Sequence, residues 1–225
     1  QLLIDGGRDR SVLRELGKRM SPLDRSIDVV VATHPDADHI GGLSSVFSNY
    51  RVSKYITPDI DSDTNTAEEL VFRVGKEKDV EVLTARRGMR IDMGGGAYAD
   101  ILFPDRNVSD VETNTGSITM RVVYGETEFL LSGDAPLSIE NWLVTLDGEY
   151  LQSDVLKAGH HGSRTSTSGE WLEKVNPSFV VISAGKDNSY GHPHQEVVDK
   201  IIASGATLLS TTDGAVRFVS DGKTL

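Results

Sequence analysis

The chain has 225 residues, of which 38% are hydrophobic and 25% are charged. This composition is that of one globular domain and excludes a disordered chain, and no apolar run is long enough to span a bilayer. The absence of cysteine excludes disulfides and thiolate ligands, so any metal must be held by His and carboxylate side chains. The formal net charge of −11 argues against tight, sequence-independent binding of nucleic acid, which usually needs a basic surface.

Short apolar, β-branched runs alternate with amphipathic stretches, which predicts an α/β fold in one domain spanning residues 1–225. In chain order, we expect strands at 2–4, 27–32, 118–123, 129–131 and 179–182, and helices at 11–20, 43–50, 66–76, 136–146 and 195–203. Ser11 is expected to cap the first helix, and Pro136 to lie in the first turn of the fourth.

Glycines mark two of the expected turns. Gly125 lies between two predicted strands and indicates a hairpin, so the sheet should be mixed. Residues 94–96 are all glycine and predict a tight turn between strands, because no phosphate-binding pattern follows them. The polar segments 59–66 and 106–116 are expected to be surface loops that could border a site. The chain begins inside the first strand-like run, so we expect it to be part of a longer protein.

All six histidines lie in three short segments that also contain acids or hydroxyls, and each segment follows a predicted strand. Loops that follow strands converge at one edge of a sheet, where sites are commonly built. The first segment, T-H-P-D-A-D-H-I-G-G, places His34, Asp36, Asp38 and His39 within six positions on a tight turn. Imidazole nitrogen combined with carboxylate oxygen suits zinc, manganese or iron(II). We therefore predict a metal site here, in preference to a turn whose histidines are solvated.

Two further features follow apolar strands. Asp134 ends the sequence S-G-D at a strand tip; alone it would be an ordinary turn, but beside the first segment it predicts a carboxylate that bridges two ions. His160 and His161 lie in L-K-A-G-H-H-G-S. Adjacent side chains on an extended chain point in opposite directions, so we expect one of the pair to be a ligand and the other to support the site or contact substrate.

The neighbours of these histidines have two interpretations each. Ser163 and Arg164 begin a hydroxyl-rich stretch that either holds a phosphate or carboxylate or is an ordinary polar loop. In Y-G-H-P-H, His192 is a candidate for protonating a leaving oxygen, because imidazole is the usual general acid near neutral pH. His194 precedes a helix and is expected either to cap that helix or to contact a neighbouring group, including substrate.

These motifs together resemble the metallo-β-lactamase superfamily. The segments H-H-G-S and G-H-P-H, with I-D-G-G near the start and T-D-G-A-V-R-F near the end, more narrowly resemble the hydrolase-like domain of ComEC-type competence (DNA-uptake) proteins. The resemblance implies an αββα sandwich of two mixed sheets flanked by helices, with a metal site at one edge. It implies one or two divalent ions, zinc or manganese.

The resemblance also implies roles for the candidate residues. The first ion would be held by His34 and Asp36, the second by Asp38 and His39, and Asp134 would bridge them. Of the histidine pair, we expect His160 to be the ligand and His161 to lie close behind it as a catalytic group. Asp38 would also orient the attacking water, His192 would donate a proton, and Ser163, Arg164 and His194 would contact substrate.

The sequence departs from the family pattern in two ways. Asp36 stands where the first motif usually has a histidine, which favours harder metals such as manganese. No histidine lies between His39 and His160, so the usual middle ligand is missing and Asn114 or a nearby loop group would have to replace it.

The implied function is metal-dependent phosphodiester hydrolysis by a nuclease-type domain in DNA uptake, with single-stranded DNA as substrate. The domain would be attached to a membrane channel protein, on the extracellular or periplasmic face; a stand-alone chain would be secreted or cytoplasmic. One alternative is an esterase for small phosphodiesters of the choline-phosphate type, which suits the acidic composition. Another is a catalytically weak metal-containing binding domain. β-Lactam hydrolysis has only the fold in its favour.

Overall fold

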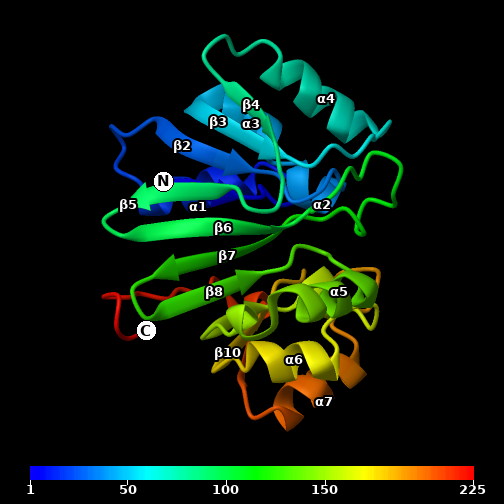
Figure 1. Ribbon diagram of the computed structural model, residues 1–225. Coiled ribbons are helices and arrows are strands. Elements are labelled where there is room, and N and C mark those ends of the chain that lie inside the picture. The colour runs from blue at the N-terminus through cyan, green and yellow to red at the C-terminus, as the bar shows by residue number, and fades with distance from the viewer.

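The computed structural model describes residues 1–225, and two β-sheets pack against each other with helices on both outer faces (Figure 1). The first sheet has the order β1-β2-β3-β4 and is parallel throughout. Its strands are β1 (Leu2–Ile4), β2 (Ser26–Val31), β3 (Arg51–Thr57) and β4 (Glu81–Thr84). The crossovers that parallel pairing requires contain α1 (Ser11–Arg19), α2 (Ala37–Ile40), α3 (Leu43–Asn49) and α4 (Asn65–Val74).

The second sheet has the order β11-β10-β9-β8-β7-β6-β5 and is mixed. Strands β5 to β8 pair antiparallel, and β8 to β11 pair parallel. The strands are β5 (Arg90–Gly94), β6 (Ala97–Phe103), β7 (Thr119–Tyr124), β8 (Thr127–Leu131), β9 (Val155–Lys157), β10 (Phe179–Ile182) and β11 (Thr207–Ser210). The helices of this half are α5 (Leu137–Asp147), α6 (Gly169–Val175) and α7 (Gln195–Ala203).

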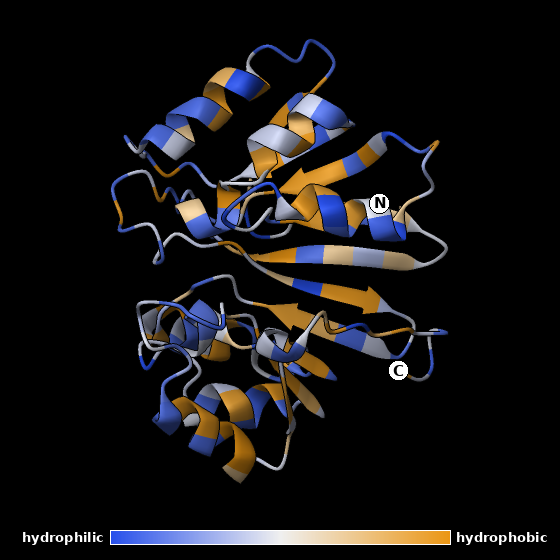
Figure 2. Ribbon diagram, turned by 180° about the vertical axis from the view of Figure 1, so that it is seen from behind, coloured by the Kyte–Doolittle hydropathy of each residue, from blue (hydrophilic) through white to orange (hydrophobic).

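Three apolar clusters hold the layers together. The cluster between the sheets includes Val31 and Ile56 from the first sheet and Ile101 and Met120 from the second. A second cluster joins α1, α3 and α4 to the first sheet, and a third joins α5, α6 and α7 to the second. Figure 2 shows the same division, with mostly apolar strands and helices that are apolar on one side and hydrophilic on the other. The expected αββα sandwich is confirmed.

Every strand and helix predicted from the sequence is present, with its ends shifted by two residues at most. The hairpin at Gly125 joins β7 to β8, and the triple-glycine turn joins β5 to β6. The expected role of Ser11 is wrong: Ser11 is the first helical residue, and its N–H donates to Asp9 Oδ1 at 2.8 Å. Pro136 occupies the cap position directly before α5. Only the second sheet is mixed.

Several strands of the structure were not predicted from the sequence, because they contain too many polar side chains to show an apolar strand pattern. Strand β4 is the edge of the first sheet, and its Val82 is 55% exposed. The hairpin of β5 and β6 is likewise at an edge, with Arg90 paired to Asp100 on its surface. Edge strands in natural sheets commonly carry charged side chains, so the apolar pattern that predicts a strand is weak there.

The topology brings the predicted site residues to one edge of the sandwich. Strands β1 and β2 are parallel to each other, and so are β8, β9 and β10, so within each sheet these strands end on the same side. Asp5 follows β1, the segment from Thr33 follows β2, Asp134 follows β8 and His160 follows β9. None of the helices has the length and apolar character needed to span a lipid bilayer.

Candidate metal centre

His34 lies in the loop after β2 and is fully buried. Its Nδ1 is 3.0 Å from Thr33 Oγ1, and that hydroxyl donates its own hydrogen to Asp5 Oδ2 at 2.8 Å. The Thr33 oxygen therefore accepts from Nδ1–H of His34, which leaves Nε2 of His34 with a lone pair. This Nε2 has no hydrogen-bond partner and lies 3.7 Å from Asp36 Oδ2 and 3.9 Å from Asp134 Oδ2.

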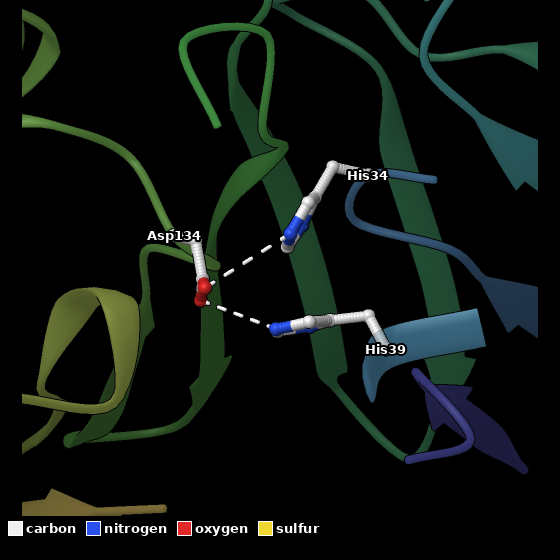
Figure 3. Close-up of side chains that lie close together, drawn as sticks. All are labelled: His34, His39 and Asp134. Carbon is white, nitrogen blue, oxygen red and sulfur yellow. Dashed lines mark ion pairs between the residues drawn. The ribbon is translucent and has the colours of Figure 1, made fainter. Parts of the chain in front are cut away.

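His39 lies in the short helix α2 and is also buried. Its Nδ1 donates to Asp5 Oδ2 at 2.7 Å, since an ionised carboxylate can only accept. Its Nε2 is therefore directed into the cluster, 3.3 Å from Asp134 Oδ1. Figure 3 shows His34 and His39 approaching Asp134 from the same side. The outer hydrogen bond of each histidine fixes which ring nitrogen is available to a metal.

His161 approaches from the second sheet. Its Nδ1 donates to the carbonyl oxygen of Ser183 at 2.6 Å, so its Nε2 is the available nitrogen. This Nε2 lies 3.1 Å from Asp38 Oδ2, 3.3 Å from Asp134 Oδ2 and 3.1 Å from His39 Nε2. The lone pairs of His39 Nε2 and His161 Nε2 would point at each other and repel. This close approach is favourable only when a cation or a proton lies between the two nitrogens.

The donor atoms form two adjoining groups that could each hold an ion. In one group His34, His39 and Asp134, and in the other Asp38, His39 and His161, offer ligand atoms within 4.8 Å of one another. Together the two groups offer three imidazole nitrogens with fixed tautomers and two carboxylates, a donor set that suits zinc or manganese. The partnerless Nε2 of His34 and Oδ1 of Asp134, both buried, fit a bound cation, because buried polar atoms otherwise find a hydrogen-bond partner.

The electrostatics of the cluster match this interpretation. Burial lowers the pKa of His34 to about 4, so His34 is neutral. Burial also disfavours charge on His39, but Asp134 and Asp5 outweigh it and raise the pKa of His39 to about 10. The hydrogen bond from His161 lowers the pKa of Asp38 to about 2. A divalent ion would therefore displace a proton held between these histidines and carboxylates.

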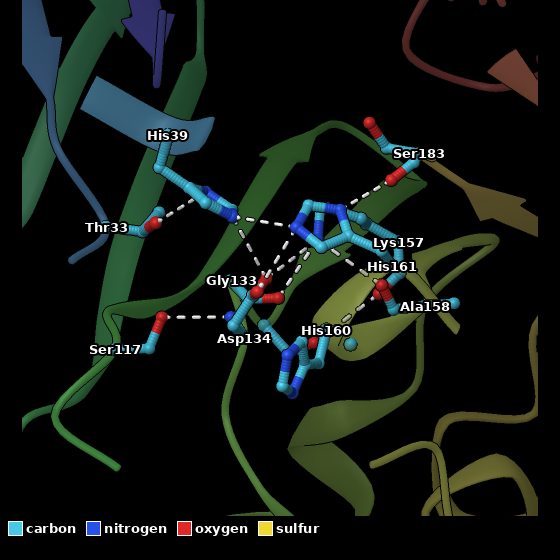
Figure 4. A network of polar contacts seen from close by, with 12 residues as sticks. Thr33, His39, Ser117, Gly133, Asp134, Lys157, Ala158, His160, His161 and Ser183 are labelled. Carbon is cyan, nitrogen blue, oxygen red and sulfur yellow. Dashed lines mark hydrogen bonds and ion pairs between the residues drawn. The ribbon is translucent and has the colours of Figure 1, made fainter. Parts of the chain in front are cut away.

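His161, in place of His160, joins the cluster, and the backbone explains why. Both residues adopt left-handed conformations, with φ of 45° for His160 and 56° for His161, so their side chains do not alternate as on an extended strand. Figure 4 shows the ring of His161 directed to Asp134 and His39, and the ring of His160 directed away. The Nδ1 of His160 lies 3.0 Å from the hydroxyl of Thr165. This arrangement differs from the expectation that His160 is the ligand.

The residues expected to contact substrate each bond to a neighbouring residue of the surrounding loops. Ser163 is buried, and its hydroxyl bonds with Thr165 at 3.0 Å. Arg164 is exposed and pairs with Glu196 at 3.5 Å. His194 takes the cap position of α7 without a side-chain capping bond; instead its Nδ1 accepts the N–H of Arg164 at 3.0 Å. These three residues therefore support the loops around the site.

His192 lies beside the histidine pair. Its ring is 6.4 Å from that of His161 and nearly parallel to it, and 5.5 Å from that of His160. Burial lowers its pKa below the ordinary histidine value. Asn188 donates to the carbonyl oxygen of His192 at 2.6 Å and accepts its N–H at 2.9 Å, which fixes the turn that carries the ring.

Three supporting residues were not among the sequence candidates. Asp5, the carboxylate behind His39, occurs as one acid after a short strand, with only the I-D-G-G motif to mark it. Lys157 donates to the carbonyl oxygen of Gly133 at 2.9 Å and lies 3.7 Å from Asp134. Ser117 accepts the N–H of Asp134 at 3.0 Å. Each acts through a segment distant in sequence, so no local pattern indicates it.

The loop before β7 lies where a middle ligand would be needed. Burial raises the pKa of Asp36, and Thr113 of this loop lowers it in part. The side-chain oxygen of Asn114 is buried without a hydrogen-bond partner, and the carbonyl oxygen of Asn114 accepts the N–H of Ser117 at 3.1 Å. No histidine stands in this loop, so the loop adds no imidazole to the group around His34.

Comparison with known proteins agrees with this fold. Residues 1–186 match the family model of the metallo-beta-lactamase superfamily. The chain is 27% identical to the ComE operon protein 3 of Bacillus subtilis and 33% identical to the competence protein ComA of Neisseria gonorrhoeae, in each case over 195 residues. Both alignments cover 86% of this chain and 25% of the relative, so the chain spans about a quarter of these curated relatives.

A solved structure extends the likeness to nearly the whole chain. Zinc-bound PqqB from Methylobacterium extorquens aligns with a TM-score of 0.53 at 11% identity, over 93% of this chain and 81% of that one. At this identity the likeness concerns the fold alone. The family match covers most of the chain and the αββα layers agree with it, so the chain belongs to the metallo-β-lactamase superfamily, with competence proteins among its relatives.

Proposed function

We propose that the chain is a metal-dependent phosphodiester hydrolase of the nuclease type that acts on single-stranded DNA during DNA uptake. The observation that carries the proposal is the convergence of the Nε2 atoms of His34, His39 and His161 on the carboxylate of Asp134. Such a set holds divalent ions, zinc or manganese. An ion held there would lower the pKa of bound water and offset the negative charge of phosphate oxygens.

The residues of the chain divide the remaining work. Asp38 is half-exposed and, with a pKa of about 2, is ionised at every physiological pH, so it both binds an ion and orients the attacking water. His192 lies next to the cluster, with its ring 6.4 Å from that of His161, so it is placed to donate a proton to the leaving oxygen. Lys157 stays beside Asp134 and limits the negative charge of the site.

The relatives support the biological setting. One of them is named competence protein ComA, and the others include ComE operon protein 3 of Bacillus subtilis and recombination protein 2 of Haemophilus influenzae. Because the chain spans about a quarter of the first two, we infer that it is one domain of a larger membrane channel protein. We place this domain on the extracellular or periplasmic face, where incoming DNA arrives.

The test is cleavage of labelled single-stranded DNA by chelator-treated protein to which zinc or manganese is restored. Asp38→Ala should abolish cleavage, whereas Asp79→Ala, which changes an exposed acid away from the site, should leave it unchanged. Full activity of Asp38→Ala, or cleavage that persists in chelator, would contradict the proposal.

A second candidate is an esterase for small phosphodiesters such as choline-phosphate esters. The net charge of −11 favours it, because a DNA strand is repelled by an acidic surface more than a small zwitterionic ester is. Comparing kcat/KM on single-stranded DNA with that on a chromogenic choline-phosphate ester separates the two: a higher value on the small ester, with the same dependence on Asp38, would establish the esterase.

A third candidate is a metal-containing binding domain with little catalysis, favoured by the missing middle histidine in the loop at Asn114. Such a domain would bind metal stoichiometrically and hydrolyse neither substrate.

A further inference from the structure

A cavity of about 460 Å³ opens next to the candidate metal centre. Asp38 and His161 border it on the side of the cluster, and its other walls include Arg8, Tyr190 and His192. Neither Arg8 nor Tyr190 has a part in the chemistry proposed above. Their position within one cavity with the candidate ligands indicates a role in holding substrate.

Tyr190 offers an open aromatic face at this cavity. Its side chain is 72% exposed, and its ring is nearly parallel to that of His192, at 5.8 Å between centroids and 23° between planes. His192 is in turn nearly parallel to His161, so the three rings form a row from the cluster to the solvent. Exposed aromatic faces in single-strand binding proteins stack on nucleobases.

Hydrogen bonds from Asn188 hold the turn that carries Tyr190. The side chain of Asn188 donates to the carbonyl oxygens of Gly185 and His192, at 2.8 and 2.6 Å, and accepts the N–H of His192 at 2.9 Å. These bonds hold the turn on both sides of the tyrosine. A platform that is already in place loses little conformational entropy when a planar group stacks on it.

Arg8 faces the cavity from the loop after β1. It is exposed, and it makes neither an ion pair nor a side-chain hydrogen bond. The backbone at Arg8 lies directly against the turn of the first motif. The N–H of Gly42 donates to the carbonyl oxygen of Gly7 at 2.9 Å. The carbonyl oxygen of Arg8 approaches Gly41 so closely that a side chain at Gly41 would clash with it. An unpaired guanidinium in a chain of net charge −11 is suited to an anion such as a phosphate.

We propose that this cavity binds the nucleotide unit next to the scissile phosphodiester, with its base stacked on Tyr190 and a backbone phosphate against Arg8. The proposal rests on the phosphodiesterase function and adds that the enzyme recognises the base as well as the phosphate. A second cavity beside the cluster is lined by Phe218, but that ring packs on Phe129 and Phe179, at 5.8 and 5.5 Å, so it has less aromatic surface to offer.

The experiment compares an oligothymidine with an oligomer of the same length whose units are abasic tetrahydrofuran. Binding is measured by fluorescence anisotropy in chelator, and hydrolysis is measured with manganese restored. Tyr190→Ala should weaken binding of the oligothymidine and raise its KM about tenfold, the effect of losing one stacked base, without affecting the abasic oligomer. Tyr190→Phe should keep the native values. Phe72→Ala, which removes an exposed aromatic ring on α4, should have no effect.

Arg8→Gln should weaken binding of both oligomers alike and reduce the salt dependence of binding, as loss of one phosphate contact does. Equal binding and KM for native protein and Tyr190→Ala, with normal hydrolysis, would overturn the base site and leave the phosphodiesterase in place. A loss in Phe218→Ala alone would move the base to the other cavity and equally overturn the proposal. Binding that depends on Tyr190, with no hydrolysis in zinc or manganese, would support the base site and contradict the proposed catalysis.

Discussion

The Nε2 atoms of His39 and His161 lie 3.1 Å apart although 122 residues separate them in the chain. Each ring is held from behind, His39 by the carboxylate of Asp5 and His161 by the carbonyl oxygen of Ser183. Two neutral imidazoles fixed in this way repel each other. Protons relieve this repulsion in the metal-free protein, where the pKa values of both rings are raised, and a bound metal ion would take the place of these protons.

Replacing each member of the histidine pair separates ligand from neighbour. His161→Ala should weaken metal binding by more than the roughly 10–100-fold that loss of an outer partner costs, because it removes a nitrogen that faces Asp38 and Asp134. His160→Ala should leave metal affinity within a few-fold of the native value. Titration calorimetry with zinc measures both. The reverse order of effects would restore His160 as the ligand.

Asp5 should matter without touching the metal. Asp5→Asn keeps the shape of the side chain and suits the positive φ of 59° at this position, but it removes the charge that holds His39. We expect metal affinity to fall about 10–100-fold, as for other outer partners. Asp9→Asn, in the same loop but bonded to Ser11, is the control. Native affinity in Asp5→Asn would show that the hydrogen bond alone, without charge, suffices.

Metal binding should release protons. Carboxylates raise the pKa of His39 to about 10, and the bonds to Asp134 and Asp38 outweigh burial and raise that of His161 to about 9. The metal-free cluster therefore binds protons at pH 7, and affinity for zinc should fall further as the pH is lowered. Calorimetry in two buffers of different ionisation enthalpy counts the released protons. Identical heats in both buffers would contradict this mechanism.

Glu140 should make the stability of the fold depend on pH. Burial raises its pKa from 4.5 to about 7, although its carboxylate accepts the N–H groups of Thr167 and Ser168, at 2.5 and 2.9 Å. An acid with a raised folded-state pKa binds its proton more tightly when folded, so the free energy of unfolding should decrease as the pH rises from 4.5 to 7, by up to about 3 kcal/mol.

Urea unfolding of chelator-treated protein at several pH values checks the Glu140 prediction, with Glu140→Gln as the variant that cannot titrate and Glu69→Gln, exposed on α4, as the control. The decrease with pH should be smaller in Glu140→Gln than in native protein and in Glu69→Gln. Parallel curves for all three proteins would exclude Glu140 as the source.

The first motif and Asp134 could be predicted from the sequence because each follows an apolar strand and the donors are close together in the chain. The choice between His160 and His161 could not, since it depends on two consecutive left-handed residues, and nothing in the sequence H-H specifies that conformation. Asp5 was missed for a different reason. It acts on a histidine 34 residues away, and one acid after a strand is an ordinary turn until the fold places it behind His39.

For the fold, too, some elements could be predicted from the sequence and others could not. Strands with continuous apolar runs, such as β2 and β10, could be predicted, whereas β4 and β5 at the sheet edges could not, because half of their side chains face water. The predicted ends of the helices agree well with the structure. At the start of α1, however, the carboxylate of Asp9 accepts the N–H of Ser11, whereas residue preferences alone predict that Ser11 itself caps the helix.

The cluster takes His34 and His39 from the segment that follows β2 of the first sheet, and Asp134 and His161 from the segments that follow β8 and β9 of the second. In a chain without cysteine, an ion held by either donor group would bind residues from both sheets and so act as a cross-link between the two halves of the sandwich at one edge. After loss of the ion the halves would still be joined there by packing and by the hydrogen bond from the N–H of Ile118 to the carbonyl oxygen of Thr33, at 2.8 Å, so the ion would govern how far this edge can open.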